Sequence, residues 1–274
     1  MGGGGVRRVI VVAASPRTGS SLLSEALSAT GVAGAPQEYI NPSILLRDPF
    51  GVGPVRWSVR GRLGRVRRRV VGDPRWDRPV PERFTRASVV SILDNVGQRW
   101  VSGDGVLSIK VMWGDYRRMM LDRGLDMSVW GAPVSWVWIR RDDRVRQAVS
   151  WSRALQTGAW AGRGSGASTG PVYDRRLIEA CVRMADTDEA GWREHFSAWQ
   201  GEPPLAVTYE ALSGEYEATM SRVFDHLGVR GVAVPAPPLE RMADELSEQW
   251  VTQFLAGGEV ASVASCMQRR RVIG

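Results

Sequence analysis

The chain has 274 residues, of which 43% are hydrophobic and 24% charged, and its formal net charge is +7. This composition excludes a disordered protein, which would hold fewer apolar residues, and the longest apolar run, Val9–Ala14, is too short to span a bilayer. Because Met1–Arg8 has neither the apolar core nor the cleavage pattern of a secretory signal, we expect a cytoplasmic protein without a transmembrane segment.

The hydrophobic pattern predicts strands and helices that alternate along the chain. In chain order these are a strand at Arg8–Ala14, helices at Ser21–Thr30 and Ala87–Trp100, strands at Gly105–Trp113 and Pro133–Arg140, helices at Asp143–Leu155 and Asp174–Trp199 (with a break near Asp186–Asp188), a strand at Leu205–Thr208, and helices at Glu215–Leu227 and Leu239–Leu255. Residues 44–88 are predicted as an irregular, arginine-rich excursion and residues 162–171 as a flexible loop. The alternation predicts an α/β fold, a three-layer parallel β-sheet with helices on both faces, in one domain over residues 1–274.

The cysteines and histidines are too few for a metal centre. Cys181 and Cys266 lie far apart, and two cysteines alone make neither a disulfide scaffold nor a structural zinc site, so we expect two reduced thiols. His195 and His226 lie in helix-like stretches beside large apolar residues, which favours packing. We therefore expect no metal, and we assign acid–base chemistry to carboxylates.

The basic residues are unevenly divided between the two types. Lys110 is the only lysine among 36 basic residues, and it lies in an apolar segment. A surface site in so arginine-rich a chain would tolerate arginine, whereas a compact ammonium group cannot be replaced by guanidinium. The run Arg60–Arg69 is compatible with a nucleic-acid patch, although a solvated arm or helix face is the commoner role of such a run.

The first strand leads into SPRTGSS, residues 15–21, at the start of a helix. In a parallel sheet, ligands bind beyond the carboxyl ends of the strands, and a helix N-terminus favours an anion there. Gly19 lets the backbone approach closely, Thr18, Ser20 and Ser21 add hydroxyl donors, and Arg17 adds a planar cation. The spacing of a Walker A loop is absent. An ordinary turn with a serine cap is the alternative.

A second candidate anion site is WVWIRRDDRVRQAVSW, residues 136–151. Arg140 and Arg141 lie at the carboxyl end of a strand, and Ser150 lies about two turns into the next helix. Guanidinium and hydroxyl donors placed together could hold a phosphate. The alternative is a helix start capped by Asp142 or Asp143, with the arginines in solvent.

Together the two segments resemble the phosphate sites of sulfotransferases that use 3′-phosphoadenosine 5′-phosphosulfate (PAPS). SPRTGSS is similar to the 5′-phosphosulfate loop, RRDDRVRQAVS to the 3′-phosphate segment, SIKVMW to the strand with a catalytic lysine, and VTYEAL to the adenine-contacting strand end. More narrowly, the chain resembles the bacterial trehalose sulfotransferase type over about Val9–Trp250. The segments that carry this resemblance are TGVAGAPQEYINP, KVMWGD, RRDDRVRQAVSWSRALQTGAW, GPVYD and VTYEAL. The resemblance implies a P-loop-like sulfotransferase fold and a homodimer.

Two departures from the widespread cytosolic sulfotransferases affect the expected site. Arg141 lies nine positions before Ser150, one more than in those relatives, and Arg140 lies ten before it; we favour Arg141 for the 3′-phosphate and leave Arg140 open. The relatives carry a catalytic histidine two residues after the lysine, where this chain has Met112. The trehalose sulfotransferase type implies Glu38 as the base instead. The alternative is a loop carboxylate paired with an arginine.

The resemblance implies transfer of a sulfuryl group from PAPS to a hydroxyl, with release of adenosine 3′,5′-bisphosphate (PAP) and no metal. Glu38 would accept the hydroxyl proton, while Lys110 and Arg17 would stabilise charge on the departing phosphate. Donor-binding roles fall to Arg17, Thr18, Gly19, Ser20, Ser21, Arg141 and Ser150. Tyr209 would contact adenine, with a core tyrosine as the alternative.

The acceptor is expected to be a small molecule with a hydroxyl group: a sugar, a glycolipid or a natural product. The excursion and the flexible loop are predicted to border its cleft, where Trp57, Trp76 and Trp160 would stack on a sugar ring or an apolar scaffold. We expect no nucleic-acid partner. Two other classes stay open: a P-loop-like nucleotide kinase, although a Walker lysine and a magnesium-binding acid are missing, and a basic nucleic-acid-binding protein that uses Arg60–Arg69.

Overall fold

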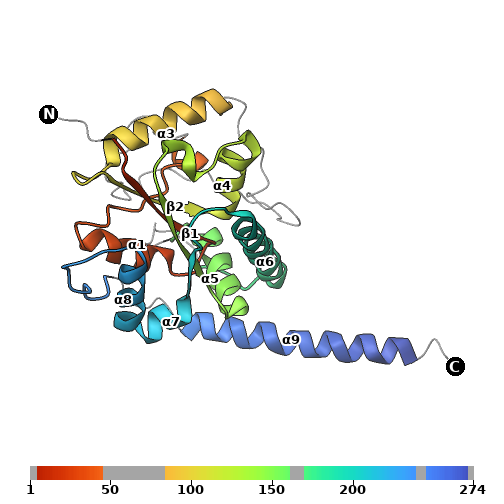
Figure 1. The fold of residues 1–274 in the computed structure, drawn as a ribbon. Coiled ribbons are helices and arrows are strands. Elements are labelled where there is room, and N and C mark those ends of the chain that lie inside the picture. The colour runs from red at the N-terminus through yellow and green to blue at the C-terminus, as the bar shows by residue number, and fades with distance from the viewer. Residues whose placement is uncertain (1–4, 46–83, 161–169, 239–244, 271–274) are drawn as a thin grey trace.

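The computed structural model describes residues 5–45, 84–160, 170–238 and 245–270, the last thirteen of them by their backbone alone. Four strands, β1 (Arg8–Ala14), β2 (Val106–Met112), β3 (Val134–Arg140) and β4 (Leu205–Thr208), form one sheet in the order β2-β1-β3-β4. All three strand pairs are parallel. Each strand lies within one residue of its predicted bounds, and the predicted α/β class is confirmed (Figure 1).

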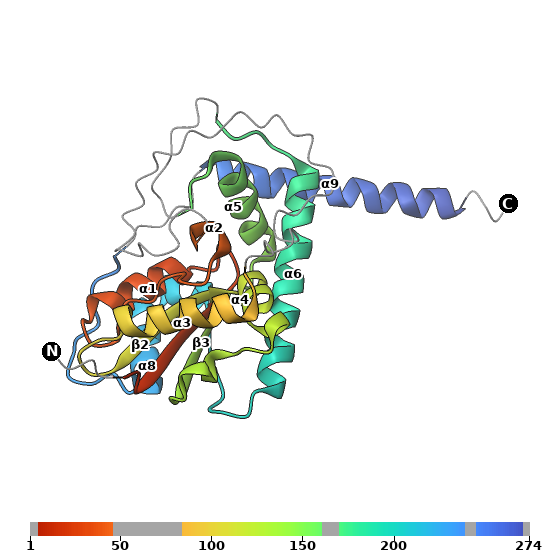
Figure 2. The same cartoon turned by 90° about the horizontal axis from the view of Figure 1, so that it is seen from above.

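Helices fill the intervals between the strands. They are α1 (Ser20–Ala29), α2 (Pro42–Leu45), α3 (Arg86–Trp100), α4 (Trp113–Met119), α5 (Arg144–Thr157), α6 (Arg175–Ala198), α7 (Tyr209–Gly214), α8 (Tyr216–His226) and α9 (Glu245–Arg270), with 3-10 turns η1 (Leu121–Arg123) and η2 (Met127–Trp130). The far end of α9 points away from the rest of the molecule (Figure 1, Figure 2). No helix in the described residues is long and apolar enough to cross a membrane.

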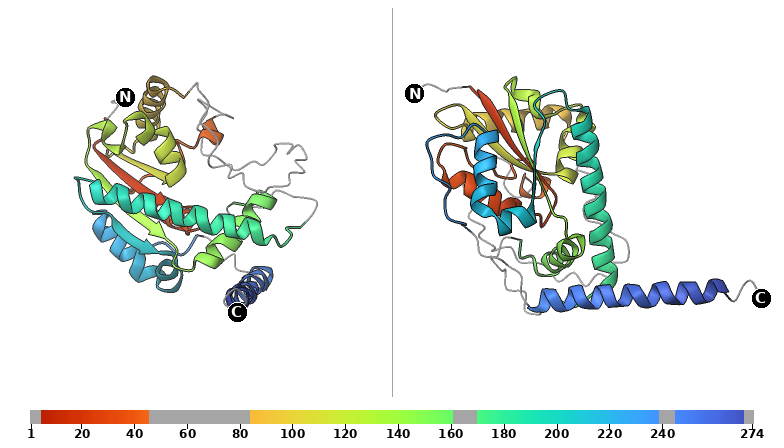
Figure 3. Two further views of the ribbon diagram at one scale, coloured as in Figure 1. Left: turned by 90° about the vertical axis from the view of Figure 1, so that its right-hand side faces the viewer. Right: turned by 60° about the horizontal axis from the view of Figure 1, so that its bottom comes forward.

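The central strand β1 is buried on both faces, which explains its unbroken apolar sequence. Its side chains alternate between two cores because successive residues of a strand point to opposite faces. Val9, Val11 and Ala13 pack with α3, α4 and the indole of Trp192 in α6, while the even-numbered residues pack with α1, α7 and α8. Helices therefore cover both faces of the sheet, as predicted (Figure 3).

A third core joins α5, α6 and α9 beside the sheet. Trp151, Ile178 and Trp250 are among its buried members. Trp160 packs half-buried against this cluster, so part of its ring serves the fold. Cys181 is a free, buried thiol in the same core, and burial raises its pKa to about 12. These contacts fix α5, and therefore the second candidate anion segment, against α6.

Two helix predictions are wrong. The break expected near Asp186–Asp188 does not occur, because tertiary contacts take up the polar side chains that would otherwise compete with the helix backbone. Asp186 pairs with Arg144 at 2.9 Å, and Asp188 accepts a hydrogen bond from Ser15. The last helix also runs past the predicted end at Leu255, since each glycine in a helix costs only about 1 kcal/mol.

Short helices were missed where side-chain patterns give little periodic signal. α2 and α4 were not predicted, and the residues before the predicted helix at 215–227 form α7, which Thr208 caps by accepting a hydrogen bond from the amide of Ala211. Arg86 begins α3, so the expected irregular excursion ends before it. Outside the described residues lie Trp57, Trp76, the run Arg60–Arg69 and most of the loop at 162–171. The side chain of Cys266 is also outside them.

Candidate active site

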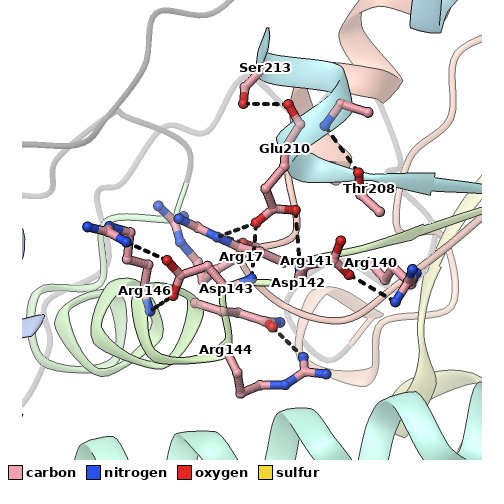
Figure 4. Close-up of polar contacts among 12 residues, drawn as sticks. Arg17, Arg140, Arg141, Asp142, Asp143, Arg144, Arg146, Thr208, Glu210 and Ser213 are labelled. Atoms are coloured by element: carbon pink, nitrogen blue, oxygen red, sulfur yellow. Dashed lines mark hydrogen bonds and ion pairs between the residues drawn. The ribbon is translucent and has the colours of Figure 1, made fainter. Parts of the chain in front are cut away.

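The carboxyl ends of the parallel strands bring the predicted anion segments to one edge of the sheet. The loop after β1 leads into α1, the turn after β3 leads into α5, and Tyr209 begins α7 directly after β4. Figure 4 shows Arg17 of the first segment beside Arg141 of the second. Both anion segments and the predicted adenine contact therefore share one site.

The loop before α1 has the backbone geometry of a close-approach site. Gly19 is the N-cap of α1 with φ +84°, and a Cβ atom on it would lie 2.7 Å from Cδ2 of Tyr209. Only glycine fits there without strain. No side chain caps the helix, so the serine-capped turn that the sequence left open is wrong. The Thr18 hydroxyl donates to the carbonyl of Ser15 at 2.8 Å and thereby closes the loop.

Arg17 joins the two anion segments. Its Nε donates to Oγ of Ser150 at 2.8 Å, and its Nη1 donates to the carbonyl of Trp160. Burial, with a further contribution from the charge of Arg141, lowers the pKa of Arg17 to about 10. The guanidinium is still a cation at neutral pH. Of the other predicted loop donors, Ser20 is buried and Ser21 is half-buried in the first turn of α1.

The two arginines after β3 have different environments, which separates their roles. Arg141 lies over the ring of Tyr209, 4.3 Å from its centroid, and donates to the carbonyl of Arg17 at 3.3 Å. Arg140 instead pairs with Asp142 at 2.9 Å and lies 3.9 Å from Glu189 (Figure 4). Arg141 alone of the pair thus contacts the loop before α1.

The turn between β3 and α5 is held by a carboxylate that the sequence analysis missed. Glu210 accepts hydrogen bonds from the amides of Asp142 and Asp143, both at 3.1 Å, and its Oε1 lies 4.0 Å from Nε of Arg141 (Figure 4). Asp143 caps α5 by accepting from the amide of Arg146 at 2.9 Å, as the alternative for this segment proposed. That alternative is wrong about Arg141, which is not in solvent: its side chain is 12% exposed.

Lys110 and Glu38 form an ion pair, with Nζ and Oε1 3.0 Å apart. The chain before Glu38 runs along β2, where the carbonyl of Gln37 accepts a hydrogen bond from the amide of Lys110 at 3.0 Å. Lys110 is 8% exposed, so it is not a strand-edge surface lysine. Glu38 pairs with the sole lysine rather than with an arginine, contrary to the alternative left open for it.

The environment of Glu38 keeps its carboxylate ionised. Burial by itself would raise its pKa, but the Lys110 ammonium and hydrogen bonds from Lys110 and Asn41 together hold the pKa below its ordinary value. Nδ2 of Asn41 donates to Oε2 at 2.8 Å. Asn41 was missed in the sequence, although it lies three residues after Glu38 in PQEYINP.

Two further carboxyl groups near this pair also went unpredicted. Burial, with the charge of Glu38 as the next contribution, raises the pKa of Asp115 to about 7, although Arg118 lies 3.0 Å from it. Burial and the charge of Asp115 raise the pKa of Asp188 to about 7. His195 lies instead in an aromatic cluster with Trp113 and other rings, as expected for a packing histidine. Within the described part of the chain, no group of His, Cys, Asp and Glu side chains could hold a metal ion.

The fold and site together define a class of protein: an α/β protein with a glycine-capped helix start after strand β1 and a lysine–carboxylate ion pair at the neighbouring strand β2. Residues 9–257 match the sequence model of the Stf0 sulphotransferase family. The chain belongs to this family and is a sulfotransferase, as its motifs indicated. Membership favours this function over the nucleotide kinase and nucleic-acid-binding alternatives.

Two curated relatives are similar over nearly their whole length. A trehalose 2-sulfotransferase of Mycobacterium tuberculosis (strain ATCC 35801 / TMC 107 / Erdman) is 31% identical over 262 residues, covering 91% of this chain and 95% of the relative. That of Mycolicibacterium smegmatis (strain ATCC 700084 / mc(2)155) is 31% identical over 263 residues, covering 89% and 93%. A solved structure, the sulfotransferase domain from the Synechococcus PCC 7002 olefin synthase, is 15% identical with a TM-score of 0.45, covering 89% of this chain and 83% of that one.

Proposed function

We propose that this sulfotransferase takes its sulfuryl group from PAPS and transfers it to a hydroxyl of a carbohydrate or secondary-metabolite acceptor. The observation that carries the proposal is the direct connection between the two anion segments. Arg17 of the first donates to Ser150 of the second, and Arg141 of the second donates to the carbonyl of Arg17. A nucleotide with phosphate groups on both the 3′ and the 5′ oxygen of its ribose can bridge two such adjoining segments.

The residues present fit such a donor. Nε of Arg141 is buried and makes no hydrogen bond among the described residues, with Oε1 of Glu210 4.0 Å away, so it can still donate to an anion. Arg141 and Ser150 would hold the 3′-phosphate. The backbone amides of Thr18–Ser21, which lead into α1, would hold the 5′-phosphosulfate, because the N-terminus of a helix favours negative charge. Tyr209 lies partly exposed between the two segments, where it would contact adenine.

The chemistry follows from three side chains. PAPS supplies the sulfuryl group on a phosphate leaving group. As the acceptor oxygen forms its bond to sulfur, Glu38 would take the hydroxyl proton, a role typically worth about 10²–10⁴ in rate. The sulfur–oxygen bond to the phosphate breaks and leaves its electron pair on that oxygen. Lys110 and Arg17 would stabilise this charge, and loss of one such group typically costs about 3–4 kcal/mol of barrier. No metal takes part in this scheme.

The acceptor class rests on the family. The relatives are named as trehalose 2-sulfotransferases, so trehalose is the first acceptor to test, followed by glycolipids and hydroxylated natural products. The homodimer and the cytoplasmic location expected from the sequence stay predictions.

The donor proposal is tested by calorimetric titration of PAP, with ATP as the competing nucleotide. Arg141→Met is compared with Arg140→Met, which changes the neighbouring arginine that pairs with Asp142 instead. We expect PAP to bind in the micromolar range or tighter and ATP much more weakly. Hydrogen bonds to a charged group are worth about 1.5–3 kcal/mol, so Arg141→Met should weaken PAP binding about tenfold to hundredfold. Binding of PAP no tighter than ATP would contradict the donor proposal, and an equal loss in both variants would contradict the assignment of Arg141 to the 3′-phosphate.

A further inference from the structure

Four consecutive carbonyl groups, that of the last residue of β1 and the first three of the loop before α1, each accept a hydrogen bond from a side-chain donor. The donor–carbonyl pairs are Trp192 Nε1 to Ala14 (3.0 Å), Thr18 Oγ1 to Ser15 (2.8 Å), Gln147 Nε2 to Pro16 (2.8 Å) and Arg141 Nη1 to Arg17 (3.3 Å). Two of the four donors come from the second anion segment. The loop is therefore shaped by residues far away in the sequence as well as by its own.

These contacts determine which way the peptide groups of the loop face. A peptide group is planar, with its carbonyl and its amide pointing in opposite directions, so a carbonyl held on one side turns the following amide to the other. Arg17 has φ +67° in this loop, a region that residues other than glycine seldom adopt. Such a conformation persists only where the surroundings hold it, and the carbonyls on both sides of Arg17 are held here by Gln147 and Arg141.

Gln147 is built into the fold as a rigid donor. It lies in α5 and is fully buried, and its amide oxygen accepts a hydrogen bond from Nη1 of Arg144 at 2.6 Å. Arg144 in turn pairs with Asp186 and Glu189 of α6. With its oxygen fixed by Arg144, the amide nitrogen of Gln147 must face the carbonyl of Pro16. The proposed contacts to PAPS use Arg141 and Ser150 from this segment and leave Gln147 without a role.

We propose that Gln147 is a positioning residue for the sulfuryl donor PAPS. By holding the carbonyl of Pro16, it keeps Arg17 and the following amides turned toward the 5′-phosphosulfate. This inference rests on the proposed function. It gives the segment that would hold the 3′-phosphate a second role, because the same segment would also shape the loop that holds the 5′-phosphosulfate of PAPS. Loss of Gln147 should therefore affect recognition of the 5′ end selectively.

Two variants remove the hydrogen-bond donor of the Gln147 side chain and keep the size of that side chain. Gln147→Glu preserves the acceptor for Arg144 but sets a carboxylate oxygen against the carbonyl of Pro16. Gln147→Met removes both hydrogen bonds and fills the buried space, and it carries the comparison should Gln147→Glu fail to fold. The matched control is Gln98→Glu, the same chemical change at an exposed position of α3. Thermal melting without ligand measures the effect of each change on the fold.

The readout is calorimetric affinity for three nucleotides: PAP, adenosine 5′-monophosphate and adenosine 3′-monophosphate. We expect the Gln147 variants to lose about tenfold or more in affinity for the two ligands with a 5′-phosphate. Their affinity for the 3′-monophosphate should change less than about threefold, and the KM for PAPS should rise. Unchanged PAP affinity in a folded variant, or equal losses for both monophosphates, would overturn the positioning role alone. If the unmodified chain does not bind PAP, the proposed function fails, and this inference fails with it.

Discussion

Asn41 offers a way to change the proposed base without touching Glu38 or Lys110. Its Nδ2 donates to Oε2 of Glu38 at 2.8 Å, while its Oδ1 accepts from the amide of Ser43 at 2.9 Å. Asn41→Leu keeps a side chain of similar size and removes the hydrogen bond to the carboxylate. The ion pair between Lys110 and Glu38, 3.0 Å long, involves the other carboxylate oxygen and is left in place.

The size of the effect follows from the bond that is lost. A hydrogen bond to a charged group is worth about 1.5–3 kcal/mol, and a pKa shift of one unit corresponds to about 1.4 kcal/mol. Glu38 is 18% exposed, so solvent screens the bond only in part. Because the bond stabilises the ionised form, its loss should destabilise the carboxylate by about 1.5–3 kcal/mol and raise the pKa of Glu38. Activity that needs the carboxylate is lost as pH falls through this higher pKa, so the acidic limb moves to higher pH.

The assay is the pH dependence of kcat/KM for sulfuryl transfer, from about pH 4 to pH 8, in the native chain and Asn41→Leu. A carbon-13 titration of the labelled Glu38 carboxyl measures the same pKa without turnover. In Glu38→Gln the remaining rate should lack the acidic limb, which serves as the control. An acidic limb that stays in place in Asn41→Leu while the measured pKa of Glu38 rises would refute the assignment of Glu38 as the base.

Three other predictions concern catalysis, pH and packing. Glu38→Gln should lower kcat by about 10²–10⁴ and leave the Kd for PAP within about threefold, as measured by steady-state kinetics and calorimetry. The pKa of Asp115 is raised to about 7 in the folded chain, so the folded state binds more protons than the unfolded state. The free energy of unfolding therefore falls as pH rises toward 7. In Asp115→Asn this contribution is absent, so the melting temperature should fall less between about pH 5 and pH 7 than in the native chain. A Cβ atom on Gly191 would lie 2.1 Å from Trp113, so Gly191→Ala should lower the free energy of unfolding in urea by about 1–3 kcal/mol. Gly114→Ala, whose Cβ would lie 3.8 Å from the Arg118 side chain, an ordinary van der Waals distance, should raise it by up to about 1 kcal/mol.

The elements that the sequence predicted well are short, mostly apolar strands bounded by turn residues. β1, whose residues Val9–Ala14 are all apolar, was located within a residue, and so was the loop at residues 15–21, which follows directly from its end. The sequence analysis singled out Lys110 and Glu38 separately, but it did not predict that they form an ion pair. Their contact depends on Gln37 adding to the edge of β2, a pairing that no local pattern specifies.

The sequence could not predict the contacts that residues from different elements make at the carboxyl edge of the sheet. Gln147 and Glu210 are ordinary polar residues in their own helices, and only the packing of α5 and α7 against the loops brings them to the site. The choice between Arg140 and Arg141 was likewise open, because spacing in the sequence does not show which guanidinium faces Tyr209. Buried carboxyl groups such as Asp115 differ from surface ones only in their surroundings.

The central place of β1 has a consequence for how the chain is made. β1 is synthesised before both of its neighbours in the sheet, β2, which begins at Val106, and β3, which ends at Arg140. During synthesis its apolar residues therefore have neither of these partner strands until β2 is complete at Met112. Pairings so distant in the sequence fold slowly and leave hydrophobic strands exposed. The strand that leads into the loop before α1 thus waits for its partner strands longer than β2 or β3 does as the chain emerges from the ribosome.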